Sequence, residues 1–105
     1  MNNSLESTGL PPETIKKIQQ VFKRCPDIHL VRLYGSRALG NHHHGSDIDL
    51  TVMDEKVTSS QLLRIEMALD DLLLPYKIDL SLFRQIENND LTDHIQRVGV
   101  DFYRR

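Results

Sequence analysis

Two short segments of strand-like composition flank a polar loop near the middle of the chain. The segment 27–35 (DIHLVRLYG) is rich in branched and aromatic residues and ends in a glycine, and the segment 46–54 (SDIDLTVMD) begins after the loop. Both compositions are typical of β-strands. Since every other element must pack on these strands or extend their sheet, the pair constrains the fold more than any other part of the sequence.

Helical periodicity marks three further segments. Apolar residues recur at helical spacing in 13–24 and in 59–75, and the composition of 89–98 indicates a last helix. Apolar and polar residues alternate over 76–83, as in a strand, and 100–103 fits a short edge strand. This order of helices and strands predicts an α/β fold, a small β-sheet with helices packed on it.

The length and the distribution of polar residues set the expected boundaries. A chain of 105 residues has room for one domain. Residues 1–10 are polar and are expected to form a flexible segment, which leaves 11–105 as the single domain. Ser59 or Ser60 is the expected N-cap of the helix over 59–75.

Composition argues against several classes of protein. The formal net charge of -2 gives no global positive field, so no direct nucleic-acid binding is predicted. No apolar run reaches the about 20 residues that span a bilayer, so no membrane partner is expected. The first residues lack the basic and apolar regions of a secretory signal, and a cytoplasmic protein is therefore expected. The lone Cys25 is read as a small hydrophobic residue.

Two acidic residues open the second of the two strands. Side chains alternate along a strand, so Asp47 and Asp49 project from one face, about 7 Å apart at the backbone, while Ile48 and Leu50 project from the other. Two carboxylates held this close repel each other, and a divalent cation between them relieves the repulsion. Oxygen ligands of this kind suit Mg²⁺ or Mn²⁺. Acidic residues are common at strand starts, so the pair by itself is weak support.

The turn before the loop adds donors for an anion. Gly35 lets a phosphate approach the backbone, and Ser36 is expected to cap a short helical turn over 37–39 whose free amides face the anion. Arg37 is expected to help neutralise the charge. A Gly-Ser turn alone is more often only a turn. Together with a third acid, Asp79, on another predicted strand, it completes the set of groups that two-metal phosphoryl transfer uses.

The combined pattern resembles that of a known family. The spacing GS-x10-DxD, from Gly35 to Asp49, resembles the signature of the DNA polymerase beta-type nucleotidyltransferase superfamily. The segments GSRALG and GSDIDL most resemble those of the minimal nucleotidyltransferases (MNT), and the similarity spans residues 12–103. These are small bacterial proteins often paired with a helical HEPN protein. The resemblance implies the polymerase beta-like palm fold, with a small mixed β-sheet.

The resemblance also implies roles for particular residues. In the family, the Gly-Ser turn holds the triphosphate of a nucleotide, and acids on neighbouring strands bind two Mg²⁺ ions, for which Mn²⁺ can substitute. The nucleotide-binding residues implied here are Gly35, Ser36, Arg37 and Ser46. The residues implied to bind metal and to catalyse the reaction are Asp47, Asp49 and Asp79. The assignment of Asp79 rests on its position in a strand and not on the motif itself.

The implied function is that of an antitoxin enzyme. A Mg²⁺-dependent nucleotidyltransferase would transfer a nucleoside monophosphate, AMP from ATP, to a hydroxyl acceptor, a tyrosine of a partner HEPN toxin. One alternative is a non-catalytic binding module that neutralises the HEPN partner by occlusion. A second is a transferase that modifies a small molecule such as an aminoglycoside. A homo-oligomer is left open.

Three consecutive histidines lie in the loop between the two strands. His42, His43 and His44 depart from the family's usual loop, and adjacent loop residues rarely present all their rings to one ion. A solvated loop tip is the favoured interpretation, with contact to a nucleotide or a protein partner next and a dedicated metal site last. His29 and His94 have no motif around them and are expected to be structural or surface residues.

Overall fold

One mixed β-sheet organises the chain. The computed structural model describes residues 4–105 and confirms the expected α/β arrangement. The sheet has four strands in the order β3-β2-β1-β4. The strands are β1 (Leu30–Tyr34), β2 (Ile48–Val52), β3 (Ile78–Leu82) and β4 (Val100–Arg104). β1 runs antiparallel to β2 and β4, whereas β2 and β3 are parallel, and β4 lies at an edge as predicted.

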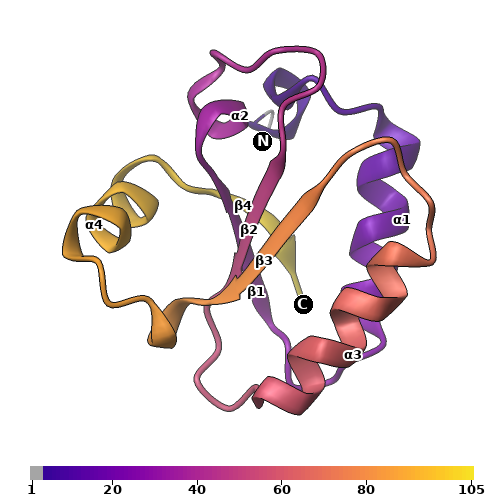
Figure 1. The fold of residues 1–105 in the computed structure, drawn as a ribbon, viewed down its shortest axis with the longest axis vertical. Coiled ribbons are helices and arrows are strands. Elements are labelled where there is room, and N and C mark those ends of the chain that lie inside the picture. The colour runs from indigo at the N-terminus through magenta and orange to yellow at the C-terminus, as the bar shows by residue number, and fades with distance from the viewer. Residues whose placement is uncertain (1–3) are drawn as a thin grey trace.

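The helices cover the two faces of the sheet unequally (Figure 1). α1 and α3 lie side by side on one face, α4 lies on the opposite face, and α2 sits at the end of β1. The helices are α1 (Pro12–Lys23), α2 (Ser36–Leu39), α3 (Ser59–Asp70) and α4 (Asn89–Val98), with two 3-10 helices, η1 (Ser4–Thr8) and η2 (Phe83–Gln85). Within residues 4–105, no helix has the length and apolar character needed to cross a bilayer.

The main core fills the space between the sheet and the pair α1 and α3. Apolar residues at helical spacing on α1 meet the alternate apolar residues of the strands, because each element presents one apolar face. The fully buried members with no exposed surface are Ile18, Val21, Phe22, Ile28, Val31, Leu33, Ile48, Leu50, Val52 and Val57. The apolar face predicted for Ile48 and Leu50 is therefore confirmed.

The start of α3 differs from the prediction. The N-cap is Thr58, one residue before Ser59, because Thr58 and Gln61 form a capping box. The Thr58 hydroxyl accepts from the Gln61 amide at 3.1 Å, and the Gln61 side-chain oxygen accepts from the Thr58 amide at 2.8 Å. The helix also ends at Asp70, short of the predicted boundary.

Residues 4–10 of the segment that was expected to be flexible, 1–10, contact the rest of the domain. Ser4–Thr8 form a 3-10 helix, Thr8 has no exposed surface, and Leu10 is buried in the core. The polar composition hid this outcome, since the partners that hold the segment come from distant parts of the chain. Residues 1–3 of the expected flexible segment lie outside the described residues.

A pair of identical substitutions tests the position of the core. Leu50→Ala should lower the free energy of unfolding by about 2–5 kcal/mol, because it leaves a cavity beneath a fully buried strand position. Leu63→Ala on α3, where the side chain is 57% exposed, should change it by less than about 0.5 kcal/mol. Urea unfolding followed by circular dichroism measures both values. Equal losses in the two variants would contradict the described core.

Candidate active site

The parallel pairing of β2 and β3 brings two of the predicted site residues together. Asp49 is the register partner of Asp79, so the two carboxylates project from the same face of adjacent strands, which lie about 4.8 Å apart. Asp47 stands two residues before Asp49, on the same side by alternation. The opposite face of β2 carries Ile48 and Leu50, both fully buried. Burial of the apolar face therefore fixes the acids on the other one.

Burial and two neighbouring acids act on the Asp49 carboxyl. Burial raises the pKa of Asp49, and the negative charges of Asp79 and Asp47 raise it further. Asp47 and Asp79 are exposed, whereas Asp49 is half-buried. Within residues 4–105, no three carboxylate, histidine or cysteine side chains converge closely enough to form a ready-made ion site. Asp49 is thus repelled by Asp79 and Asp47, and the three acids are not closed around a common centre.

A tyrosine that sequence reasoning missed lies beside the acids. Tyr34 on β1 is the register partner of Asp49 and is buried. Burial raises the pKa of the Tyr34 hydroxyl, a hydrogen bond with Ser81 opposes this, and the charges of Asp49 and Asp79 add to it. The Ser81 hydroxyl donates to the Thr51 hydroxyl at 3.0 Å. Strand alternation over 27–35 could have placed Tyr34 on the acidic face, where it stays protonated.

Gly35 connects the turn to the acids directly. Its φ of 78° and ψ of -155° belong to a region that only glycine adopts readily. A Cβ built at Gly35 would collide with the Oδ2 atom of Asp49, so the carboxylate lies against the glycine Cα. Any side chain at this position would displace Asp49. The glycine is therefore required both by the backbone conformation and by the neighbouring carboxylate.

The expected helical turn after Gly35 is present, with a different cap. Gly35 is the N-cap of α2, its carbonyl accepts from the amides of Ala38 and Leu39 at 3.1 Å each, and Ser36 is the first helical residue. Ser36 was predicted to be the cap, and this prediction is wrong. The helix has no side-chain cap, which leaves the Ser36 hydroxyl free of that bond.

Arg37 is turned into the protein. Only 1% of the residue is exposed, and its Nη1 donates to the Thr8 carbonyl at 2.7 Å. Its Nε and Nη2 both donate to the Ser46 carbonyl, at 3.2 and 2.9 Å. The guanidinium carbon lies 5.1 Å from the centre of the Tyr76 ring. A planar group with several donors suits this arrangement, since carbonyls on two sides share its charge.

These contacts give Arg37 and Ser46 a role in holding the loop. The Ser46 hydroxyl also accepts from the His43 amide at 2.7 Å, so both groups of Ser46 are used inside the loop. Their sequence-based assignment as nucleotide contacts stays a prediction. In this structure both side chains have protein partners. Ser46 immediately precedes Asp47, so the bonds that Arg37 and His43 make to Ser46 also hold the backbone that leads into Asp47.

The three loop histidines do not act as a unit. His43 and His44 are exposed, in keeping with a solvated loop tip. His42 is half-buried against Gly9, and its buried Nδ1 has no hydrogen-bond partner. His42 thus packs the loop onto the N-terminal segment.

A histidine outside the motif reaches the Gly-Ser turn. His94 on α4 accepts a hydrogen bond from the Gly35 amide through Nε2 at 3.2 Å. Its ring meets the Tyr34 ring edge-on, with centroids 6.3 Å apart. The sequence predicted only a structural or surface role for His94. No local signal could have found this contact, because it joins residues from different elements.

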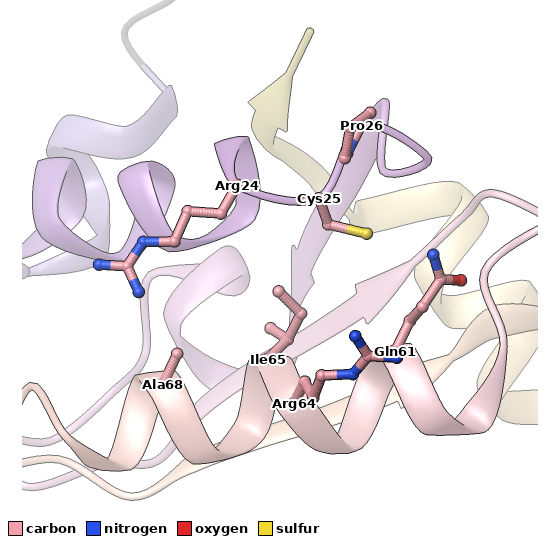
Figure 2. Close-up of a pocket in the computed structure, with 7 residues that line it drawn as sticks. All are labelled: Arg24, Cys25, Pro26, Gln61, Arg64, Ile65 and Ala68. Carbon is pink, nitrogen blue, oxygen red and sulfur yellow. The ribbon is translucent and has the colours of Figure 1, made fainter.

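A separate pocket lies on the other face of the sheet (Figure 2). It has a volume of about 300 Å³ and is situated between the end of α1 and α3. Figure 2 shows Cys25, in the segment after α1, across the pocket from Ile65 on α3, and Arg24 and Arg64 also line it. Cys25 is buried, as expected for a small hydrophobic residue. No site residue predicted from the sequence lines this pocket.

The repulsion among the acids predicts a pH-dependent stability. The pKa of Asp49 is higher in the folded than in the unfolded chain, so the stability that its neutral form contributes is lost as the pH rises through the folded pKa. Asp49→Asn should therefore raise the free energy of unfolding at pH 7 without divalent ions. The gain should shrink as the pH falls through the folded pKa of Asp49 and should be absent below about pH 4, the pKa of an unfolded aspartate. Denaturant titrations across pH measure this. The exposed Glu55→Gln removes the same charge elsewhere and is the control. A less stable Asn variant at pH 7 would contradict the repulsion.

Similarity to known proteins agrees with this geometry. The sequence matches the family described as "Polymerase beta, Nucleotidyltransferase" over residues 16–105, a stretch that includes the Gly-Ser turn and all three acids. Among curated proteins, no match to the chain is found.

Several solved structures share the fold. A chain of a toxin–antitoxin complex with AMP-PNP has a TM-score of 0.67 at 23% identity, covering 91% of this chain and 75% of the other. A chain from the complex of a tri-AMPylated Shewanella oneidensis HEPN toxin with its MNT antitoxin gives 0.64 at 19% identity, with coverages of 89% and 71%. A putative nucleotidyltransferase from Sulfolobus solfataricus gives 0.53 at 19% identity, with coverages of 100% and 90%. At these low identities the TM-scores show a common fold and no more. The family match over residues 16–105 shows that the chain belongs to the polymerase beta-type nucleotidyltransferase family.

Proposed function

We propose that this protein is a metal-dependent nucleotidyltransferase that transfers AMP from ATP to a hydroxyl group. The observation that carries the proposal is the contact between the turn and the acids. Asp49 is paired in register with Asp79, and its carboxylate lies against the Cα of Gly35. The turn that would bind phosphate therefore lies beside a group of carboxylates, which supports phosphoryl transfer.

The acids fit divalent cations by their chemistry. Asp47, Asp49 and Asp79 would hold two Mg²⁺ ions, because they offer only oxygen ligands, and Mn²⁺ could replace Mg²⁺. Burial raises the pKa of Asp49, and the charges of Asp79 and Asp47 raise it further; a bound cation would offset that repulsion. When bound, the ions supply neutralisation of phosphate charge and a lowered pKa of the acceptor hydroxyl.

The chain's own groups orient the reactants. The Ser36 hydroxyl and the amides of the turn would hold the β- and γ-phosphates. The acceptor oxygen forms a bond to the α-phosphorus, the bond from that phosphorus to the bridging oxygen breaks, and pyrophosphate leaves. Asp79 is exposed and would take the hydroxyl proton. The buried Arg37 would keep the loop, and with it Asp47, in place.

A tyrosine of a HEPN-type partner protein is the acceptor that we propose. Solved structures of the same fold include a chain of the MntA–HepT toxin–antitoxin complex and a chain of the complex between a tri-AMPylated HEPN toxin and an MNT antitoxin. By analogy, AMP on the partner would silence a toxin, and this chain would be the antitoxin. The competing function is a binding module that covers the partner without turnover. The intact turn and acids favour the enzyme.

Transfer of label decides between the two functions. Purified protein, a HEPN-type partner protein, Mg²⁺ and α-³²P-ATP should give a labelled partner, and chelation of the metal should abolish the label. Asp47→Asn/Asp49→Asn should bind the partner and leave it unlabelled, because the carboxylates are lost without a change in side-chain size. A stable complex in which even the wild type transfers no label, yet the toxin is neutralised, would establish occlusion.

Two glycine variants test the contact between Gly35 and Asp49. Gly35→Ala should reduce the transfer rate about a hundredfold, because the new Cβ displaces the Asp49 carboxylate. Gly40→Ala is the control: Gly40 also has a positive φ, of 82°, but a Cβ there meets nothing within 4 Å. It should lose about 1–2 kcal/mol of stability and keep its activity. Rates are compared at a temperature where both variants are folded, and equal rates would contradict the role of the contact.

A further inference from the structure

The hydrogen bond between His94 and Gly35 joins a helix outside the sequence motif to the turn inside it. The Gly35 amide donates to His94 Nε2 at 3.2 Å, across 59 positions of the chain. The imidazole also meets the Tyr34 ring at 80°, and Tyr34 is the residue immediately before the turn. His94 therefore contacts both residues joined by the peptide bond that leads into Gly35, through the Tyr34 ring and the Gly35 amide.

We propose that His94 is a positioning residue of the active site, whose unprotonated Nε2 holds the Gly35 amide and thereby sets the orientation of the phosphate-binding turn. That the turn binds phosphate rests on the proposed function. The hydrogen bond itself is independent of that function. Nε2 accepts only when the ring carries its proton on Nδ1, so the proposal also assigns the tautomer.

The turn needs such a partner because Gly35 has no side chain to fix it. Its backbone conformation, φ 78° and ψ -155°, is open to glycine and to few other residues, and glycine is also the residue with the largest conformational freedom. β1 ends at Tyr34, so the Gly35 amide lies beyond the last register pair of the sheet. The imidazole supplies the acceptor that the sheet no longer provides.

The position of Gly35 in turn governs two parts of the site. The Gly35 Cα lies against the Asp49 carboxylate. Gly35 is also the N-cap of α2, whose first residue is Ser36. A rotation of the peptide between Tyr34 and Gly35 would therefore shift both the Ser36 donors and the space available to Asp49. His94 acts on the nucleotide through this peptide, without having to touch the nucleotide.

A purely structural role is the competing explanation. α4 packs on the sheet through Ile95, which has no exposed surface, and the His94 ring could contribute only to that packing. The two explanations need different atoms. Packing requires the ring against Tyr34, whereas positioning requires the acceptor at Nε2.

Two substitutions separate these atoms. His94→Gln keeps an acceptor oxygen at a similar reach and loses the ring, and His94→Phe keeps the ring and loses the acceptor. Binding of a non-hydrolysable ATP analogue in Mg²⁺ is measured by calorimetry, with urea unfolding of each variant. The Gln variant should bind within about twofold of wild type, and the Phe variant about fivefold to tenfold more weakly, as expected for the loss of one hydrogen bond. In transfer assays the Phe variant should raise KM more than it lowers kcat.

Any other order overturns the proposal. If Phe binds as wild type and Gln binds weakly, the ring is the important part, and if neither variant changes affinity, His94 positions nothing. NMR of the wild type gives a readout without nucleotide: a coupling between the Gly35 and His94 Nε2 nitrogens across the hydrogen bond, absent from both variants. Its absence in wild type would also overturn the proposal. If the coupling and the affinity order hold but no AMP is transferred, the proposed function fails and the positioning role stands.

Discussion

The buried guanidinium of Arg37 is the interaction on which the rest of the site depends. It joins three segments that are distant in sequence, because it donates to Thr8 in the N-terminal segment and to Ser46 in the loop and stacks on Tyr76 before β3. Among the described residues no carboxylate pairs with it, and its charge is shared by backbone carbonyls. Burying such a charge is unfavourable unless its donors are satisfied, so the three segments must be in place together. The acid that follows Ser46 is fixed as a result.

The fold holds the acids together against their own repulsion. The free energy for this comes from the other face of the same strand, where Ile48 and Leu50 are fully buried. A strand has only two faces, so burying the apolar set commits Asp47 and Asp49 to the side shared with Asp79. In the free protein, burial and the charges of Asp79 and Asp47 consequently raise the pKa of Asp49. A site of this kind is least stable when empty, which favours a cationic ligand.

The sequence was sufficient for features that depend on periodicity and spacing. Strand alternation predicted the shared face of the acids, and the alternation of elements predicted the fold class. The missed features depend on contacts between distant residues. Arg37 reaches Thr8 across 29 positions, and His94 reaches Gly35 across 59. Both involve backbone groups, which carry no residue-specific signal. For the same reason the N-terminal segment was predicted to be flexible, although its backbone supplies a partner for Arg37.

The electrostatics of the site bear on the choice between an enzyme and a binding module. A protein that acts only by covering its partner has no use for three neighbouring carboxylates. A neutral residue in place of Asp49 would remove a half-buried charge together with its repulsion by Asp79 and Asp47. Such a protein would equally have no use for a glycine that leaves room for Asp49, or for a histidine that holds that glycine. This chain retains the acids, the glycine and the histidine in mutual contact or register. Unfavourable charge kept in a geometry that other residues maintain is what a catalytic site requires, and it favours chemistry over occlusion.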